Sequence, residues 1–310
     1  MIPGKQRVIG AAYPGAPAYA DLVTSQFNLS TAHDPESFLA HTEEWGSKGA
    51  YEAWLAAYRK NAGSFLDHPV WGADRDLGGG RYLYGAMDDR YASNAARIFG
   101  APGGLVVDQH VRGSRACVVG AWDGTECLLL RAMGAVRVDA VEEVPEFCKM
   151  AAVQYTAWSV PGKIYARSLY EMDVESHWQA YDLLYVPGVL YHLTDLPTAV
   201  VILWAMLRPG GVLAFESICE PASKGQGTHA KYLGASVPGW NWWSPTAACY
   251  EALMHDCGFP DGRTVERHGG RGWWIGSRGD KLPALSGGAA GFSRPDVLRT
   301  IKRLQELRSL

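Results

Sequence analysis

The strand-like run Ala116-Cys117-Val118-Val119 is followed directly by Gly120-Ala121-Trp122-Asp123-Gly124. A strand that ends in a glycine-bearing turn and leads into a helix is typical of α/β proteins that bind a nucleotide at the turn. Glycine lets the backbone approach the ligand, and the first N–H groups of the helix face it. Glycines four residues apart also occur in ordinary loops, so the sequence around the turn decides what it binds.

Segments typical of strands and of helices alternate from about residue 115 onwards. This alternation predicts an α/β fold, with a parallel sheet that carries helices on both faces. The expected strands are 116–119, 137–141, 163–166, 182–186 and 212–217. The expected helices between them are 125–133, 145–155 and 196–207.

Proline and glycine mark element ends in the later part of the chain. Arg208-Pro209-Gly210-Gly211 ends the helix 196–207. Ser244-Pro245-Thr246 predicts the start of another helix, with a capping hydroxyl and proline at the first helical position. That helix would end at Gly258, and two strands near 264–267 and 272–276 would complete the domain.

Patterning along the chain predicts three parts. Residues 1–110 are expected to form a mainly helical extension, because four apolar residues there fall on one helical face. They are Tyr51, Trp54, Leu55 and Tyr58. This face would pack on the sheet domain or a second subunit, or form a lid over a substrate cavity. Residues 111–280 would form the sheet domain, and residues 281–310 a helical tail that contacts another subunit or straps the domain.

Composition narrows the class of protein. The chain has 310 residues, 47% of them hydrophobic and 20% charged, which is typical of a globular protein with a substantial core. Its 29 Lys and Arg against 32 Asp and Glu give a net charge of -3. Without an overall positive charge we do not expect a nucleic-acid partner, although a local basic patch stays open.

The cysteines and the apolar segments indicate in which cellular compartment the protein is expected. The six cysteines include no Cys-Xaa-Xaa-Cys pair, which favours a reducing, cytoplasmic setting over a disulfide framework. The first residues lack the basic and apolar runs of a signal peptide. The longest apolar segment, near 199–207, is shorter than the roughly 20 residues that span a bilayer. No His, Cys and Asp spacing predicts a metal site.

A carboxylate follows the second expected strand. Glu142 stands at the end of Val138–Val141, where an acidic residue of a nucleotide-binding unit accepts hydrogen bonds from the ribose hydroxyls. The alternative is a surface carboxylate at a helix entrance. A dinucleotide is disfavoured, because Trp122 and Thr125 stand where a pyrophosphate needs small residues.

Four motifs in this order resemble class I S-adenosylmethionine-dependent methyltransferases. They are Gly120–Gly124, Glu142, the run from Tyr181 through Gly188-Val189-Leu190-Tyr191-His192 to Leu193, and Leu207–Gly211. Gly-Ala-Trp-Asp-Gly together with Gly-Val-Leu-Tyr-His resembles the branch that contains the tRNA wobble-uridine (carboxy)methyltransferase. Asn241–Thr246 and Cys257-Gly258-Phe259 also fit that branch. The resemblance covers about residues 115–259, and the N-terminal third carries none of its motifs.

The resemblance implies a Rossmann-like sheet, S-adenosyl-L-methionine as cofactor and S-adenosylhomocysteine as product. Gly120, Ala121, Trp122 and Gly124 would border the methionine part of the cofactor, and Glu142 would hold the ribose. Ser168 and Leu169 would flank the adenine, and Gly188 to Leu190 would lie beside the methyl group. The family usually has an acidic residue two places before the first glycine, where this chain has Val118.

Tyr191 and His192 follow the fourth expected strand, at the sheet edge where ligands bind. Tyr191 would orient cofactor or substrate. His192 is the candidate general base, because an unperturbed imidazole titrates at a pKa of about 6.5; a histidine bonded into loop structure is the alternative. Glu216, at the end of the fifth expected strand, is a second candidate base and a candidate substrate contact; a structural role is the alternative.

Trp240, Trp242 and Trp243 form an aromatic cluster between Val237 and Pro245. They would form the wall of a substrate pocket or contact a substrate cation through their ring faces, or else pack in the core.

Together, the motifs and the composition lead us to expect a cytoplasmic methyltransferase that acts at nitrogen or oxygen of a small molecule. The alternatives are a tRNA wobble-uridine carboxymethyltransferase, non-methyl chemistry on the cofactor such as cyclisation, and a non-catalytic methyltransferase-like subunit. The oligomeric state is open.

Overall fold

The structure is a computed structural model of the chain, and it describes residues 53, 75–78, 81–83, 108–157, 159–221, 227–234, 241–281, 283 and 292–307. Residue contacts divide the chain into two compact units. The first unit comprises Met1–Gly104 and Ala121–Ala166, and the second comprises Leu105–Gly120 and Arg167–Leu310.

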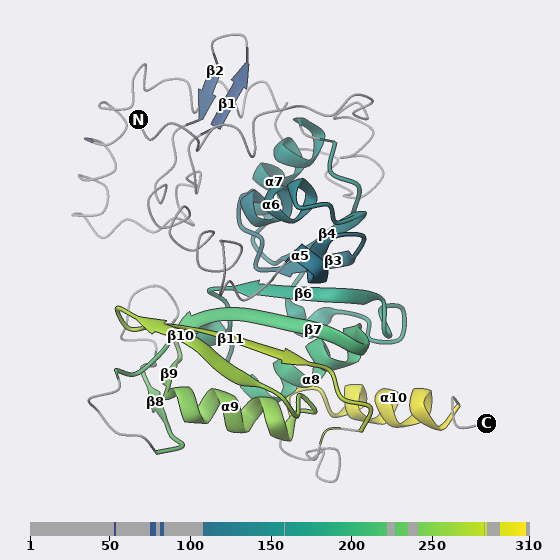
Figure 1. Cartoon of the computed structure of the whole chain (residues 1–310), viewed down its shortest axis with the longest axis vertical. Helices are drawn as coiled ribbons and strands as arrows, with labels where there is room; N and C mark the ends of the chain where they lie inside the picture. Colours follow the sequence, from purple (N-terminus) through teal and green to yellow (C-terminus); the bar gives the residue numbers. More distant parts are fainter. Residues whose placement is uncertain are drawn as a thin grey trace. The chain divides into compact units, whose positions relative to one another are not determined.

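In the first unit, β4 (Arg137–Glu142) and β5 (Ile164–Ala166) pair in parallel, with Ala140 opposite Ile164. Helices α6 (Thr125–Ala132) and α7 (Pro145–Ala157) contact each other, and both contact this strand pair (Figure 1). Every residue of β4 after Arg137 is buried, as expected for a parallel strand that is covered by other elements.

Two buried side chains of α7 hydrogen-bond to β4 and to the glycine-bearing turn. The Tyr155 hydroxyl donates to the carbonyl of Val138 in β4 at 2.9 Å. The Gln154 amide donates to the carbonyl of Asp123, in the glycine-bearing turn, at 2.8 Å. Both side chains are fully buried. Helix α7 therefore holds the strand that ends in Glu142 and the turn at once.

Five strands of the second unit lie in the order β10-β11-β7-β6-β3 (Figure 1). They are β3 (Arg115–Val119), β6 (Tyr181–Pro187), β7 (Leu207–Ile218), β10 (Arg263–His268) and β11 (Arg271–Ser277). β3, β6 and β7 are parallel, whereas β11 runs antiparallel to β7 and β10 antiparallel to β11. Because β3, β6 and β7 share one direction, their carboxyl ends lie at the same edge, where α/β proteins bind ligands.

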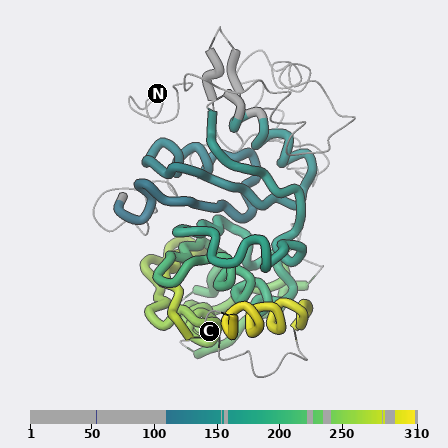
Figure 2. The backbone as a smooth tube through the Cα atoms, turned by 90° about the vertical axis from the view of Figure 1, so that its right-hand side faces the viewer, coloured from purple at the N-terminus to yellow at the C-terminus, as the bar shows by residue number. Residues whose placement is uncertain are grey.

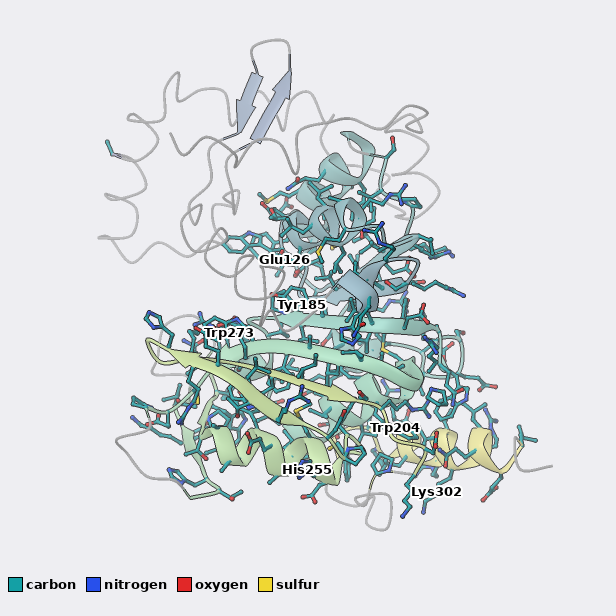
Figure 3. The ribbon with its side chains drawn as sticks, viewed as in Figure 1. Glu126, Tyr185, Trp204, His255, Trp273 and Lys302 are labelled. Atoms are coloured by element: carbon teal, nitrogen blue, oxygen red, sulfur yellow. The ribbon has the colours of Figure 1, made fainter. Side chains whose placement is uncertain are left out.

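Helix α8 (Leu196–Met206) packs on β7 and is buried along nearly its whole length. Helix α9 (Ala247–Asp256) contacts α8, β10 and β11. The Trp274 ring of β11 stacks on Phe215 of β7 at 4.9 Å and lies 4.5 Å from the Tyr250 ring of α9. Trp204 and Trp273, labelled in Figure 3, are also almost fully buried, so large aromatic rings fill this core.

Short elements complete the second unit. They are α5 (Asp108–Val111), the 3-10 helices η1 (Leu169–Glu171) and η2 (Leu190–His192), the antiparallel pair β8 (Ala230–Tyr232) and β9 (Trp243–Pro245), and α10 (Pro295–Glu306). Helix α10 is the yellow helix of Figure 2. It lies within the tail expected to be helical at 281–310, and it buries Val297, Leu298 and Ile301.

The predicted α/β class is confirmed, and each of the five expected strands and three expected helices is present. β7 begins five residues earlier than expected, because Leu207 already pairs with Tyr181. The predicted helix start at Ser244-Pro245 is wrong by two residues. Thr246 is the N-cap, its hydroxyl accepting from the Cys249 N–H at 3.2 Å, and Pro245 belongs to β9.

Most of the N-terminal part lies outside the described residues, including the aromatic face at 51–58. Ala53 is helical, and Arg75–Gly78 (β1) pairs antiparallel with Arg81–Leu83 (β2), two strands that the mainly helical prediction did not include. The domain boundaries at 110/111 and 280/281 stay a prediction. Within the part of the chain that the structure describes, no helix is long and apolar enough to cross a membrane.

Candidate functional site

The turn after β3 has the backbone that its glycines predict. Gly120 and Gly124 have φ angles of +72° and +85°, in the left-handed region that favours glycine. Trp122 also has a positive φ, +44°, which is unusual for a bulky residue. The Asp123 carboxylate accepts from the Thr125 N–H at 3.0 Å and from its hydroxyl at 2.6 Å, which fixes the start of α6.

Glu142 meets this turn within the first unit. One carboxylate oxygen accepts from the Trp122 N–H at 2.9 Å, and the other accepts from the Val144 N–H at 3.0 Å. The bond to Trp122 helps to hold the residue at its unusual φ. Glu142 is 6% exposed, so it is not the surface carboxylate of the alternative interpretation. Burial raises the pKa of Glu142, and the two N–H donors oppose that shift.

The second unit brings Gly120 against the loop that follows β6. A Cβ atom at Gly120 would lie 2.1 Å from a methyl carbon of Val189, so only glycine fits there. Gly188, with φ +67°, faces Glu216 and Tyr191: a Cβ atom there would lie 3.3 Å from a Glu216 carboxylate oxygen and 3.4 Å from the Tyr191 hydroxyl. Gly120 thus lies against Val189 of this loop, and Gly188 lies beside Glu216 and Tyr191.

Arg271 is a charged residue of this region that sequence reasoning missed. Its guanidinium lies 3.0 Å from a Glu216 carboxylate oxygen and 5.0 Å from the centre of the Tyr191 ring. Burial alone would lower the pKa of Arg271, but the charge of Glu216 and contact with Tyr191 outweigh burial and raise the pKa. Arg271 follows the Gly269-Gly270 turn between β10 and β11, and only the strand register places it beside Glu216.

Tyr191 and His192 both lie on η2, and their ring centres are 4.0 Å apart. Tyr191 is buried and His192 is half-buried. The Trp242 N–H donates to the Tyr191 carbonyl at 2.8 Å, and the Trp243 indole donates to the Thr194 carbonyl at 3.2 Å. The segment that leads into β9 therefore holds the loop that bears both candidate catalytic residues.

Trp242 and Trp243 are half-buried rather than core residues. The Tyr232 ring of β8 lies 5.3 Å from the Trp243 ring and 6.3 Å from the Trp242 ring, and Tyr232 is 61% exposed. Trp243 also lines a groove of about 560 Å³, together with Leu196 and Phe292. Trp240, the third predicted tryptophan, lies outside the described residues.

Four further predicted residues lie within the described part of the chain. Ser168 immediately precedes η1, and its N–H donates to the Glu171 carboxylate at 3.1 Å. Leu169 is buried on η1, and Ala121 and Leu190 are fully buried. Among the described residues, no cluster of three or more His, Cys, Asp or Glu side chains could hold a metal ion. The cofactor and catalytic roles of all these residues stay predictions.

No family model matches the chain. Among curated proteins, the chain is similar to a tRNA U34 carboxymethyltransferase of Hahella chejuensis, with 27% identity over 159 residues. The match covers 48% of this chain and 45% of the relative, so the chain spans less than half of that protein's length.

Among solved structures, the chain is similar to a possible exported protein of Bordetella parapertussis, with TM-score 0.49, 16% identity, and coverage of 63% of this chain and 68% of the other. Another is the 1,6-didemethyltoxoflavin-N1-methyltransferase of Burkholderia thailandensis, with TM-score 0.46, 16% identity, and coverage of 81% and 92%. At these scores the structural matches assign no activity. The match to the Hahella protein supports the resemblance to class I S-adenosylmethionine-dependent methyltransferases that the motifs indicate.

Proposed function

We propose that the chain is an S-adenosylmethionine-dependent methyltransferase whose acceptor is a small molecule, modified at nitrogen or oxygen. The observation that carries the proposal is the buried Glu142 carboxylate at the end of β4, hydrogen-bonded to the N–H of Trp122 in the glycine-bearing turn. This is where a nucleotide-binding α/β protein places the acceptor for ribose hydroxyls.

Within the first unit, the Glu142 carboxylate suits the ribose of a nucleoside. Each Glu142 oxygen already accepts one backbone N–H and, as a carboxylate oxygen, has a further lone pair for a hydroxyl. Gly120 and Gly124 permit the tight turn, whereas Trp122 would obstruct a pyrophosphate. The motif resemblance, rather than a contact, assigns Ser168 and Leu169 to the adenine and Gly188 to Leu190 to the transferred group.

Bound S-adenosylmethionine would supply a methyl group on a sulfonium sulfur, which is already activated for transfer. The protein then has to orient the acceptor and exclude water, and such positioning supplies roughly 7–11 kcal/mol of barrier reduction. His192 would take the proton from an acceptor nitrogen or hydroxyl. Tyr191, held between Arg271 and the His192 ring, would orient the reacting groups.

The acceptor is proposed to be compact. The net charge of -3 offers no overall attraction for nucleic acid. Half-buried Trp242 and Trp243 would supply aromatic walls for such a ligand.

Turnover tests the proposal. The full chain is incubated with methyl-labelled S-adenosylmethionine and a panel of small amines, phenols and N-heterocycles, and S-adenosylhomocysteine formation is followed. We expect at least one acceptor to be methylated, and His192→Gln to lower kcat about 10²–10⁴-fold. His255→Gln is the matched control, because His255 is an exposed histidine of α9 bonded to the Gly262 carbonyl. Equal losses in the two variants would contradict the role of His192.

A second candidate is carboxymethyl transfer to tRNA, the activity that the name of the Hahella relative states. Arg271 favours it, because a guanidinium beside Tyr191 suits a carboxylate on the transferred group. Retention of tRNA on a filter at moderate salt, followed by the mass of the modified nucleoside, decides between the two. A carboxymethylated uridine formed by the wild-type chain would replace the small-molecule proposal.

A further inference from the structure

One carboxylate links the candidate catalytic loop to the C-terminal helix. Asp195 is the N-cap of α8 and follows His192 by three residues. One oxygen accepts from the Thr198 N–H at 3.0 Å, and the other accepts from the Thr198 hydroxyl at 2.6 Å, which is ordinary helix capping. The second oxygen also accepts from the Ser293 N–H at 2.7 Å and from the Ser293 hydroxyl, 98 residues further along the chain.

The backbone of Asp195 is held separately. The Tyr170 hydroxyl of η1 donates to the Asp195 carbonyl at 2.8 Å and accepts from the Asp195 N–H at 2.9 Å. The carbonyl of Tyr170 in turn accepts from the Arg294 guanidinium. Residues 293 and 294 therefore reach the same loop end by two routes, one through the Asp195 side chain and one through Tyr170.

The C-terminal segment is firmly docked where it makes these contacts. Directly after Arg294, α10 buries Val297, Leu298 and Ile301, each at most 2% exposed. Burying three such side chains stabilises the docked helix by several kcal/mol, at roughly 1.5–3 kcal/mol each. Burial alone would raise the pKa of Asp195, but hydrogen bonds from Ser293 and Thr198 outweigh burial and lower the pKa, so the carboxylate is ionised at neutral pH.

The loop is also held at its other side, where Trp242 and Trp243 bond to the carbonyls of Tyr191 and Thr194. Groups of residues 191, 194 and 195 are thus hydrogen-bonded to three elements that are distant in sequence: the segment 242–243, η1 and the residues just before α10. Misplacing a catalytic group by about 1 Å can cost about 10²-fold in rate, so fixing this loop has a direct chemical consequence.

We propose that the segment 292–306 is a positioning element of the methyl-transfer site: through Asp195 and Tyr170 it holds the loop 188–195 so that Tyr191 and His192 face the reacting groups. The inference rests on the proposed function. Ser293 and Arg294 are positioning residues, because they act through the loop and touch no reacting atom.

The test uses the full chain with Ser293→Ala/Arg294→Gln, which changes the segment but leaves the loop untouched. We expect amide hydrogen exchange in 188–195 to become about tenfold faster, and kcat to fall about 10–100-fold at a nearly unchanged KM. S-adenosylhomocysteine affinity should fall by less than kcat, because only Gly188 to Leu190 of the loop are assigned to the cofactor. Arg303→Gln is the matched control, because Arg303 lies on the same helix but pairs with the exposed Glu175.

Tyr170→Phe is the second variant, and it keeps the test open if the double variant does not fold. Unchanged exchange in 188–195, or faster exchange with unchanged kcat, would overturn the inference. An equal effect of Arg303→Gln would overturn it too, because a general loosening of α10 would then explain the result. Failure of the wild-type chain to bind S-adenosylhomocysteine would refute the proposed function instead, while the exchange comparison would still decide whether the segment holds the loop.

Discussion

Gly120→Ala probes the contact between the glycine-bearing turn and the loop after β6. Gly120 has a φ of +72°, and an added Cβ atom would lie 2.1 Å from a Val189 methyl carbon. A contact this short forces one side to move. Valine is branched at Cβ and has few alternative rotamers, so its side chain yields poorly.

The expected cost has two parts. A left-handed backbone costs an alanine roughly 1–2 kcal/mol. Overpacking a filled site costs about 1–3 kcal/mol more. Together they predict a loss of about 2–5 kcal/mol in the free energy of unfolding. Gly210→Ala isolates the first part, because Gly210 has the same φ of +72° with nothing within 4 Å of the added carbon.

Urea denaturation of the two variants and the wild type gives the comparison. Gly120→Ala should be destabilised by about 1–3 kcal/mol more than Gly210→Ala. Adding Val189→Ala to Gly120→Ala should recover most of that difference, as expected for two residues in contact. Equal losses at the two glycines would refute the packing of Gly120 against Val189.

Three further predictions follow from individual contacts. Cofactor affinity should fall as the pH drops through the raised pKa of Glu142, because the ionised carboxylate accepts the hydrogen bonds of the ribose hydroxyls. In Glu142→Gln, binding titrations at several pH values should show no such fall in affinity. Arg271→Met should lower the free energy of unfolding by about 3–5 kcal/mol, because it leaves the buried Glu216 without its cation. Adding Glu216→Leu should restore the stability, as measured by thermal melts. Thr246→Ala should cost about 0.5–2 kcal/mol in urea, because it removes the N-cap of α9, and no loss would contradict that cap.

The elements that position the site were predictable from local signals. Apolar runs bounded by glycine and proline located β3, β4, β6 and β7, and the turn at 120–124 has the positive φ angles that its glycines predict. Glu142 was identified because a carboxylate at that strand end is a local feature of a nucleotide-binding unit.

Contacts between distant segments were not predictable. Arg271 meets Glu216 only because β11 pairs antiparallel with β7, and the register of that pair is not encoded in either strand alone. Likewise, the bond from Ser293 to Asp195 joins residues 98 positions apart. The start of α9 was misplaced because β9 takes up Pro245 by pairing with β8, a strand too short and too exposed to show a period-two pattern.

The central claim is that Glu142 and the turn at 120–124 bind the nucleoside of S-adenosylmethionine. Calorimetric titration with S-adenosylhomocysteine tests it most directly. We predict micromolar affinity for the wild type, at least tenfold weaker binding for Glu142→Gln, and no change for Glu143→Gln, whose side chain is exposed at the next position. Absence of heat with the wild type, or equal affinity in the two variants, would contradict the account.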